Sequence, residues 1–250
     1  SYCKNKNIQF LSTAFDHESL NFLVNDLKID RLKIPSGEIT NAPLLLAHAK
    51  TNKNLIVSTG MASLEDLQLM TTTLREAGCD NFILLKCTSA YPASPTDANL
   101  MTMPHMAEMF DCQVGLSDHT IGVGVSIAAV ALGATVVEKH FCLSRSEGGV
   151  DSDFSLEPYE LKLLVDETKR AWQALGKINY KVSKVEEKSK KFRRSLYFVK
   201  DMKAGEIITE DCVRCVRPGY GLEPKCWDNI MGCRVSKDVE RGSRVTWDYF

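Results

Sequence analysis

Two histidines stand at matching places behind neighbouring apolar stretches of the chain. His119 follows the stretch that ends at Ser117, and His140 closes the next one in Glu138-Lys139-His140. If both stretches are adjacent parallel strands, about 4.8 Å apart, the two imidazoles reach the same edge of a sheet. Such a pair is able to share one divalent metal such as Mn²⁺, Zn²⁺ or Fe²⁺, with oxygen donors completing the site. The residues alone leave a metal pair and two structural histidines equally open.

Two lysines interrupt otherwise apolar stretches, Lys33 in Arg31–Ile34 and Lys86 in Leu84–Cys87. At the mouth of a barrel such an ammonium can hold phosphate or carboxylate as a point charge, or form a Schiff base. The alternative is a lysine that extends along an edge to reach solvent. Small polar residues before helix-like stretches could add to an anion site, although each hydroxyl also suits a helix N-cap. These residues are Ser36, Gly37, Ser58, Thr59, Gly60 and Ser117.

Two further candidates lie in loops. Asp151 ends Gly148-Gly149-Val150-Asp151, a glycine-rich segment that can close over a site or form a plain turn. Arg217 begins Arg217-Pro218-Gly219, and a guanidinium suits recognition of a polar sugar substituent. A single arginine in a loop is otherwise merely solvated.

The elements that must position these residues alternate along the chain. Strand-like and helix-like stretches follow one another at a near-regular period, which predicts successive βα units and a parallel sheet. Polar residues end nearly every strand-like stretch, where TIM-type barrels build their active sites. An open doubly wound sheet also accommodates six strands but concentrates its ligand at one switch point. We therefore predict a (β/α)8 barrel that lacks its first two βα units. The predicted strands are Ile8–Ser12, Arg31–Pro35, Leu55–Thr59, Phe82–Thr88, Gln113–Ser117 and Thr135–Phe141; the predicted helices are Asp16–Leu27, Thr40–Thr51, Ser63–Ala77, Ala98–Phe110, Ile121–Leu132 and Glu157–Leu175.

The character of the sequence changes after Gly176. The stretch from Lys177 to Arg194 is rich in Lys, Glu and Ser, which is typical of a linker or an exposed helix. We interpret its basic run, Lys188–Arg194, as a solvated face rather than a nucleic-acid patch. Short strand-like pieces and turns from Ser195 onward predict a small, mostly β domain. We place the barrel domain at 1–176, the linker at 177–193 and the small domain at 194–250, with strands at Ser195–Val199, Glu206–Ile208, Arg234–Val235 and Arg244–Trp247.

Composition excludes several classes of protein. The 250 residues include 31 Lys and Arg and 32 Asp and Glu, and a net charge of -1 argues against a strongly basic nucleic-acid-binding surface. The longest apolar run, Val125–Val137, is too short for the ~20 residues that span a bilayer, so we expect no membrane segment. The nine cysteines have no regular spacing and suggest reduced thiols. With no signal peptide at the start, we expect a cytoplasmic protein.

In their order, these motifs resemble the sialic acid synthase family over essentially the whole chain. The tail from Arg194-Ser195-Leu196 to Trp247 resembles that family's antifreeze-like (SAF) domain, a β-clip fold. Family members begin with two strands carrying an Asn-His motif, a lysine and a glutamate that have no counterpart here. The matching motifs are Leu11-Ser12-Thr13-Ala14-Phe15-Asp16, Lys33-Ile34-Pro35-Ser36-Gly37-Glu38, Ser58-Thr59-Gly60-Met61, Lys86-Cys87-Thr88-Ser89-Ala90-Tyr91-Pro92, Gly115-Leu116-Ser117-Asp118-His119-Thr120, Glu138-Lys139-His140-Phe141 and Ser155-Leu156-Glu157-Pro158.

The resemblance implies an enzyme that condenses phosphoenolpyruvate with an N-acetylated hexose and releases phosphate. It implies a divalent metal, most often Mn²⁺ with Mg²⁺ or Co²⁺ as alternatives, held by His119 and His140. It also implies a domain-swapped homodimer in which Arg217 reaches the N-acetyl group of a sugar bound by the other subunit. The residues implied as catalytic are His119, His140, Glu138 and Asp151, and those implied as substrate-binding are Lys33, Ser36, Ser58, Ser89, Tyr91, Ser117 and Arg217.

More than one interpretation is open for the sugar acceptor and for the class of reaction. Gly148-Gly149-Val150-Asp151-Ser152 and Arg217-Pro218-Gly219-Tyr220-Gly221 are most like pseudaminic acid synthases, so we expect 2,4-diacetamido-2,4,6-trideoxy-L-altrose as acceptor. Pro35-Ser36-Gly37-Glu38 is closer to N-acetylneuraminate synthases, which makes N-acetylmannosamine the alternative acceptor. A Schiff-base aldolase using Lys33, Lys86 or Lys139 and a non-catalytic module that binds sugar or anion without turnover are the rival hypotheses.

Overall fold

The computed structural model describes residues 2–250, which form two compact units. The first unit ends at Lys177 and the second covers Ile178–Phe250. Each unit has a hydrophobic core of its own.

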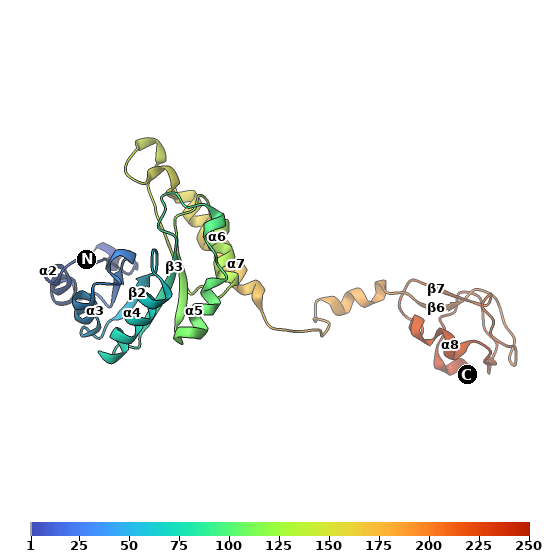
Figure 1. Cartoon of the computed structure of the whole chain (residues 1–250). Helices are drawn as coiled ribbons and strands as arrows, with labels where there is room; N and C mark the ends of the chain where they lie inside the picture. Colours follow the sequence, from blue (N-terminus) through green and yellow to red (C-terminus); the bar gives the residue numbers. More distant parts are fainter. Residues whose placement is uncertain (1) are drawn as a thin grey trace. The chain divides into compact units, whose positions relative to one another are not determined.

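A single curved parallel sheet organises the first unit (Figure 1). Its strands pair in the order of the sequence. Helices follow the strands, as the alternating pattern predicted, and α7 packs against α6. The strands are β1 (Arg31–Ile34), β2 (Asn54–Ser58), β3 (Phe82–Cys87), β4 (Gln113–Asp118) and β5 (Val136–Lys139); the helices are α3 (Ala42–Ala49), α4 (Leu64–Glu76), α5 (Thr102–Phe110), α6 (Gly124–Ala131) and α7 (Pro158–Leu175).

Alternation along the strands places successive side chains on two different faces of the sheet. Residues of one phase, such as Leu32, Val57 and Leu84, join buried residues of α3, α4, α5 and α6 in one core. This is the outer face of the sheet. The other phase carries Lys33, Ser58, Cys87, Ser117 and Glu138 on the inner face, because successive side chains point to opposite sides of a strand. Helices gathered on one face suit half of a barrel wall and not a doubly wound sheet.

Local sequence signals explain the helix boundaries well. Ser63 caps α4 and forms a capping box with Asp66, which satisfies donors of the first turn. Leu67, Met70 and Leu74 then recur at helical spacing and are buried against the sheet. The predicted helix at Ser63–Ala77 is therefore confirmed to within one residue at each end.

The strand predicted at Ile8–Ser12 is wrong. A short helix, α1 (Tyr2–Asn5), precedes these residues, and residues 8–12 themselves form no strand. They meet β1 where the amide of Lys33 donates to the Ser12 carbonyl at 3.4 Å, beside a bridge from Thr13 to Lys33. Ile8 and Phe10 are exposed, so nothing covers this stretch as a buried strand would need. The helix predicted next, Asp16–Leu27, forms as α2 (His17–Asn21) and a π-helical turn, η1 (Phe22–Asp26).

The second unit is mostly irregular β structure. Strands β6 (Ser195–Phe198) and β7 (Val213–Val216) pair antiparallel, and β7 was not predicted. The predicted strands at 206–208, 234–235 and 244–247 appear only as single bridges, Ile207–Arg234 and Tyr197–Arg244. A short helix, α8 (Trp227–Ile230), adds Ile230 to the core.

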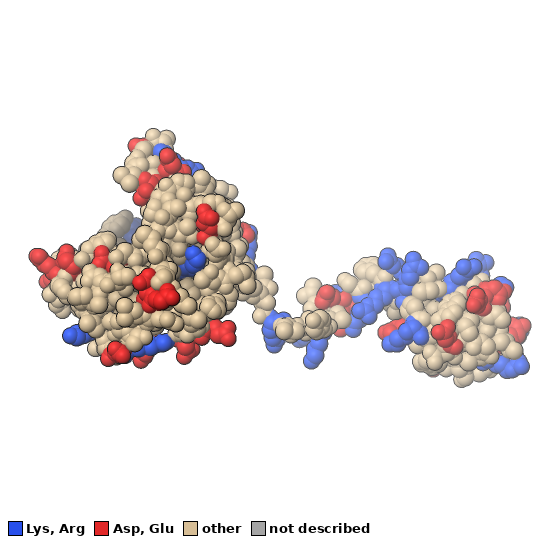
Figure 2. All heavy atoms as spheres, in the orientation of Figure 1, with Lys and Arg blue, Asp and Glu red and all other residues tan. Residues whose placement is uncertain are grey.

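The segment before β6 forms a 3-10 helix, η6 (Glu186–Phe192), without a buried residue. Figure 2 shows basic side chains gathered along the stretch that contains it. This agrees with the solvated face expected for Lys188–Arg194. No helix among residues 2–250 combines the length and apolarity that crossing a membrane requires.

Candidate functional site

The carboxyl ends of all five strands border one cavity of about 630 Å³. Its walls come from residues far apart in the sequence, because parallel strands bring their ends to one edge. Most of the predicted site residues lie here: Lys33, Ser36, Ser58, Ser89, Tyr91, Ser117, His119, Glu138 and His140.

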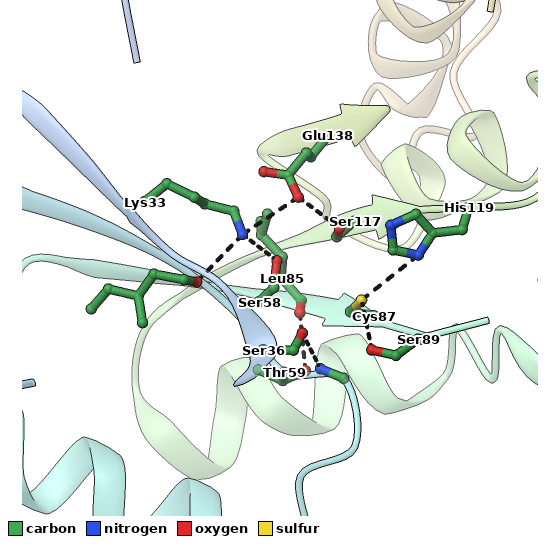
Figure 3. Close-up of polar contacts among 12 residues, drawn as sticks. Lys33, Ser36, Ser58, Thr59, Leu85, Cys87, Ser89, Ser117, His119 and Glu138 are labelled. Atoms are coloured by element: carbon green, nitrogen blue, oxygen red, sulfur yellow. Dashed lines mark hydrogen bonds and ion pairs between the residues drawn. The ribbon is translucent and has the colours of Figure 1, made fainter. Parts of the chain in front are cut away.

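A buried lysine of the edge strand β1 extends over the inner face toward Ser58 and Glu138 (Figure 3). Lys33 Nζ donates to Ser58 Oγ at 2.6 Å and to its neighbour's carbonyl, Ile34 O, at 3.3 Å. Glu138 Oε1 lies 3.4 Å from the same Nζ and accepts from Ser117 Oγ at 2.7 Å. Burial lowers the pKa of Lys33, and the Glu138 carboxylate partly opposes that shift. This ammonium is positioned to attract an anion into the cavity.

The two predicted histidines meet beside this lysine. The ring centroids of His119 and His140 are 5.2 Å apart. Burial and the neighbouring His119 lower the pKa of His140, which favours its neutral form. Burial opposes the charged form of His119 as well, but hydrogen bonds to Cys87 and the Thr88 carbonyl outweigh it and raise the pKa of His119.

The residues expected to support the sugar surround the histidine pair. The Tyr91 ring lies 4.3 Å from that of His119 and 5.9 Å from that of His140. Burial raises the pKa of the Tyr91 hydroxyl. Asp151 does not line the cavity, but its Oδ2 lies 3.7 Å from His140 Nδ1. Phe154, which carried no prediction, packs on His140 at 4.9 Å between ring centroids.

A tight contact closes the end of β2. Gly60 N donates to Ser36 Oγ at 2.9 Å. A Cβ on Gly60 would lie 2.2 Å from Ser89 Oγ and 3.1 Å from Cys87 Sγ, so a side chain here would have to displace the neighbouring hydroxyls. The close approach gathers the hydroxyls of Ser36 and Ser89 with a backbone N–H at one rim.

Sequence reasoning assigned no role to Cys87, which the structure places inside the cavity. Its Sγ lies 4.0 Å from His119 Nδ1. Burial acts to raise the pKa of the thiol, but hydrogen bonds with His119, Ser36 and Ser117 together lower it. The alternation of β3 could have indicated it, because Cys87 is out of phase with the outward Leu84. Thr13, Phe15 and Met61 also line the cavity, although they had been given no role.

Three residues that the sequence analysis considered for catalysis or binding lie outside the cavity. Lys86 shares the outward phase of Leu84 and donates to the Cys87 carbonyl at 3.1 Å. Lys139 pairs with Asp118 in the outer layer, and its side chain is 3% exposed. These contacts do not suit the Schiff-base role considered for either lysine. Arg217 lies in the second unit, directly after β7.

The two imidazoles fit the metal that the resemblance implies. A ligating histidine usually donates its second ring nitrogen to a carbonyl or carboxylate. His119 Nδ1 meets the Thr88 carbonyl at 2.9 Å, which leaves Nε2 free to coordinate. Across residues 2–250 no three His, Cys, Asp or Glu side chains converge as ligands. The pair therefore suits an ion that takes its remaining donors from substrate and water oxygens.

Known proteins share this architecture. The chain is 43% identical to the N,N'-diacetyllegionaminic acid synthase of Campylobacter jejuni serotype O:2 over 247 residues, 98% of this chain and 74% of that protein. It is 41% identical to the pseudaminic acid synthase of C. jejuni serotype O:23/36, over 97% of this chain and 70% of that protein. The crystal structure of N-acetylneuraminic acid synthetase from Leptospira borgpetersenii matches with a TM-score of 0.69 at 35% identity, over 74% of this chain and 65% of that one.

These matches confirm the TIM-type fold and the resemblance from which it was expected. The sequence matches the NeuB family over residues 1–180 and the SAF domain over residues 193–250. The chain therefore belongs to the NeuB family of sialic-acid-type synthases and ends in a SAF domain.

Proposed function

We propose that this protein condenses phosphoenolpyruvate with an N-acetylated hexose to give a nine-carbon 2-keto acid and inorganic phosphate. One observation carries the proposal: a buried ammonium, several hydroxyls and two adjacent imidazoles share one cavity in a NeuB-family chain. The cation suits an anionic three-carbon substrate, and the imidazoles suit activation of a sugar carbonyl.

Phosphoenolpyruvate would bind along the inner face. Lys33 provides the charge, while Ser58 and Ser117 keep it and Glu138 in fixed positions by hydrogen bonds. The Ser36 and Ser89 hydroxyls near Gly60 N would take further oxygens of the substrate. In this proposed pose, carbon 3 of phosphoenolpyruvate would face the histidine side of the cavity.

Carbon 3 of phosphoenolpyruvate would attack the aldehyde carbon of the open-chain sugar, forming a C–C bond while the aldehyde oxygen takes a proton and becomes a hydroxyl. Water would then add at carbon 2 with loss of one proton. Phosphate would leave by cleavage of its C–O bond as the new carbon-2 hydroxyl loses its proton and becomes the keto group. Glu138 is the carboxylate placed to take a proton from that water, since it lies between Lys33 and Ser117. Tyr91 and Asp151 flank the histidines on the side where the sugar would enter.

A divalent ion, with Mn²⁺ our first choice, would be held by His119 and His140. Bound there, it would supply Lewis-acid polarisation of the sugar carbonyl.

Three sugars are candidates for the acceptor substrate. The motifs favour the diacetamido-trideoxy-altrose of pseudaminic acid synthases, and N-acetylmannosamine is the alternative. The relative named for N,N'-diacetyllegionaminic acid adds a third, the diacetamido hexose that retro-aldol cleavage of that product would release. Of these we propose the altrose, on the Gly148–Ser152 and Arg217–Gly221 motifs.

The test is phosphate release from phosphoenolpyruvate by the complete gene product, with Mn²⁺ and each of the three sugars in turn. We expect release with one sugar, loss of release with a chelator, and a keto acid by mass spectrometry. His140→Gln should abolish turnover, whereas His105→Gln, at an exposed position of α5, should not. Binding of phosphoenolpyruvate without phosphate release with any sugar would contradict the synthase and favour the non-catalytic module.

A further inference from the structure

Two successive cross-strand pairs join β4 to β5 at their carboxyl ends. Ser117 stands opposite Glu138, and Asp118 stands opposite Lys139. Because side chains alternate, the first pair faces the cavity and the second faces the helix layer. His119 and His140 follow the outer pair immediately in their two strands. The outer pair therefore lies directly beneath the histidines without touching the cavity.

The outer pair is a buried ion pair with a complete set of partners. Lys139 Nζ lies 3.0 Å from Asp118 Oδ2, and the two side chains are 3% and 1% exposed. Asp118 Oδ1 accepts from Thr120 N at 2.8 Å and from Thr120 Oγ1 at 2.7 Å. Its Oδ2 accepts from Ser126 Oγ of α6 at 2.5 Å. Lys139 Nζ also donates to the Thr120 carbonyl.

These contacts hold the chain on both sides of His119. Asp118 precedes the histidine and Thr120 follows it, and both are tied to Lys139, the residue before His140. On the cavity side, His119 Nδ1 is fixed by the Thr88 carbonyl. The backbone that carries one imidazole is thereby linked to the backbone that carries the other.

Stability alone gives little reason for such a pair. Desolvating two charges offsets most of their attraction, and apolar residues of the same volume are often equally stable. A charged pair with directional hydrogen bonds does, however, fix relative position more narrowly than apolar packing. Here the ion pair of Asp118 and Lys139 fixes the distance between His119 and His140.

We propose that Asp118 and Lys139 are positioning residues that set the spacing of the two histidines for a shared metal. The inference rests on the proposed function, since it takes these imidazoles as the ligands. Neither side chain touches substrate or metal. Their effect acts through the backbone of residues 118–120 and 139–140.

The central variant is the double substitution Asp118→Asn with Lys139→Met. It removes both charges together, keeps a hydrogen-bonding amide for Thr120 and Ser126, and keeps an apolar stem in the lysine's place. We expect its melting temperature to stay near that of the unchanged protein, whereas each single substitution should lower it by leaving one buried charge unpaired. The control is Leu74→Ala on α4, which opens a core cavity away from the site.

Two readouts separate positioning from stability. The first is the affinity for Co²⁺ added alone, followed by its visible absorption; we expect it to fall about 10- to 100-fold in the double variant. The second needs no metal: the His119 Nδ1–H signal in histidine-labelled NMR spectra should lose its protection from exchange. Leu74→Ala should lower the melting temperature and change neither readout.

The outcomes distinguish this inference from the proposed function. A double variant with unchanged Co²⁺ affinity and unchanged histidine signals overturns the positioning role and leaves the synthase intact. If the parent protein itself fails to bind Co²⁺, the proposed metal site is overturned. In that case the NMR measurement decides the positioning role, and unchanged histidine signals in the double variant overturn it. If the double variant does not fold, Ser126→Ala takes its place: loosened histidine signals support the role, and parent-like signals contradict it.

Discussion

The carboxylate nearest to the buried ammonium of Lys33 also has a second hydrogen-bond partner. Glu138 lies 3.4 Å from Lys33 Nζ and also accepts a hydrogen bond from Ser117, so the carboxylate is not devoted to the lysine. A buried charge with an incomplete partner strongly favours an incoming ion of opposite sign. We therefore expect Lys33 to be the main charge that attracts the proposed anionic substrate.

The lowered pKa of Lys33 predicts an alkaline loss of substrate binding. Because the pKa of Lys33 is lower in the folded protein than in the unfolded chain, the unfolded chain holds the ammonium proton to higher pH. Lys33 therefore lowers the free energy of unfolding, and it does so most at low pH. The penalty fades as pH rises from the lowered pKa to the ordinary lysine value, and the cation disappears over the same window. The dissociation constant for phosphoenolpyruvate, measured by calorimetry from pH 7 to 10, should rise across it. Lys33→Met should bind weakly throughout; a steep alkaline loss in that variant would contradict the assignment.

At the scale of elements, the turn after β2 is the tightest part of the site. Gly60 lets the chain pass against Ser36, Ser89 and Cys87, and its amide is one of the donors at the rim. The strand end and the turn therefore form one unit with the side chains of β1 and β3.

Gly60→Ala should damage the site through overpacking. The added methyl must displace Ser89 or Ser36, at a cost of about 1–3 kcal/mol in unfolding free energy, and should weaken phosphoenolpyruvate binding at least tenfold. Gly124→Ala, at the start of α6 and outside the cavity, is the matched control, since a Cβ there meets nothing within 4 Å. Urea denaturation and substrate titration of both variants check this. Equal effects at the two positions would refute the steric argument.

Element prediction succeeded where periodicity and burial agree. Five predicted strands formed, and apolar residues of β1, β2, β3 and β4 share one buried core with the helices that follow them. Ile8–Ser12 has similar composition but no such cover, and composition alone cannot report that. The alternation of β3 already separated an outward Lys86 from an inward Cys87. Lys33 and Lys86 could thus have been distinguished before the structure was known, whereas the contacts of Gly60 with Ser89 depend on the pairing of distant strands.

The whole molecule consists of two units with separate cores. The first core is built on Leu84 and its neighbours, and the second on Phe198 and its neighbours, all fully buried. The division follows from the contacts between residues, which group into one unit up to Lys177 and another from Ile178 onward.

Two thermal transitions should follow from the two cores. Phe198→Ala should destabilise the second unit by about 3–5 kcal/mol and leave the transition of the first in place. Leu84→Ala should do the reverse at about 2–5 kcal/mol. Differential scanning calorimetry of both variants checks this. A single transition that moves in both would show that the units unfold as one.

The expected domain-swapped homodimer predicts complementation between inactive subunits. Arg217→Ala should impair the sugar site of the other subunit, and His140→Gln its own. Refolding the two variants together should restore about a quarter of the parent activity, because half of random dimers are mixed and each holds one intact site. Activity measured against mixing ratio checks this. No recovery from mixed dimers would place Arg217 in its own subunit's site, and an Arg217→Ala variant that is active alone would place it outside catalysis.

The paired ends of β4 and β5 also bear on how the sheet assembles. Sliding β5 by one residue would turn Glu138 toward the apolar helix layer and Lys139 into the cavity. Asp118 would then be buried without its counter-ion, and a mispaired intermediate would carry unpaired charges on both faces. Only one alignment neutralises both sides at once. A slip of one residue at this edge of the sheet is therefore penalised on both faces, so the residues around the candidate site also favour the native alignment of β4 and β5.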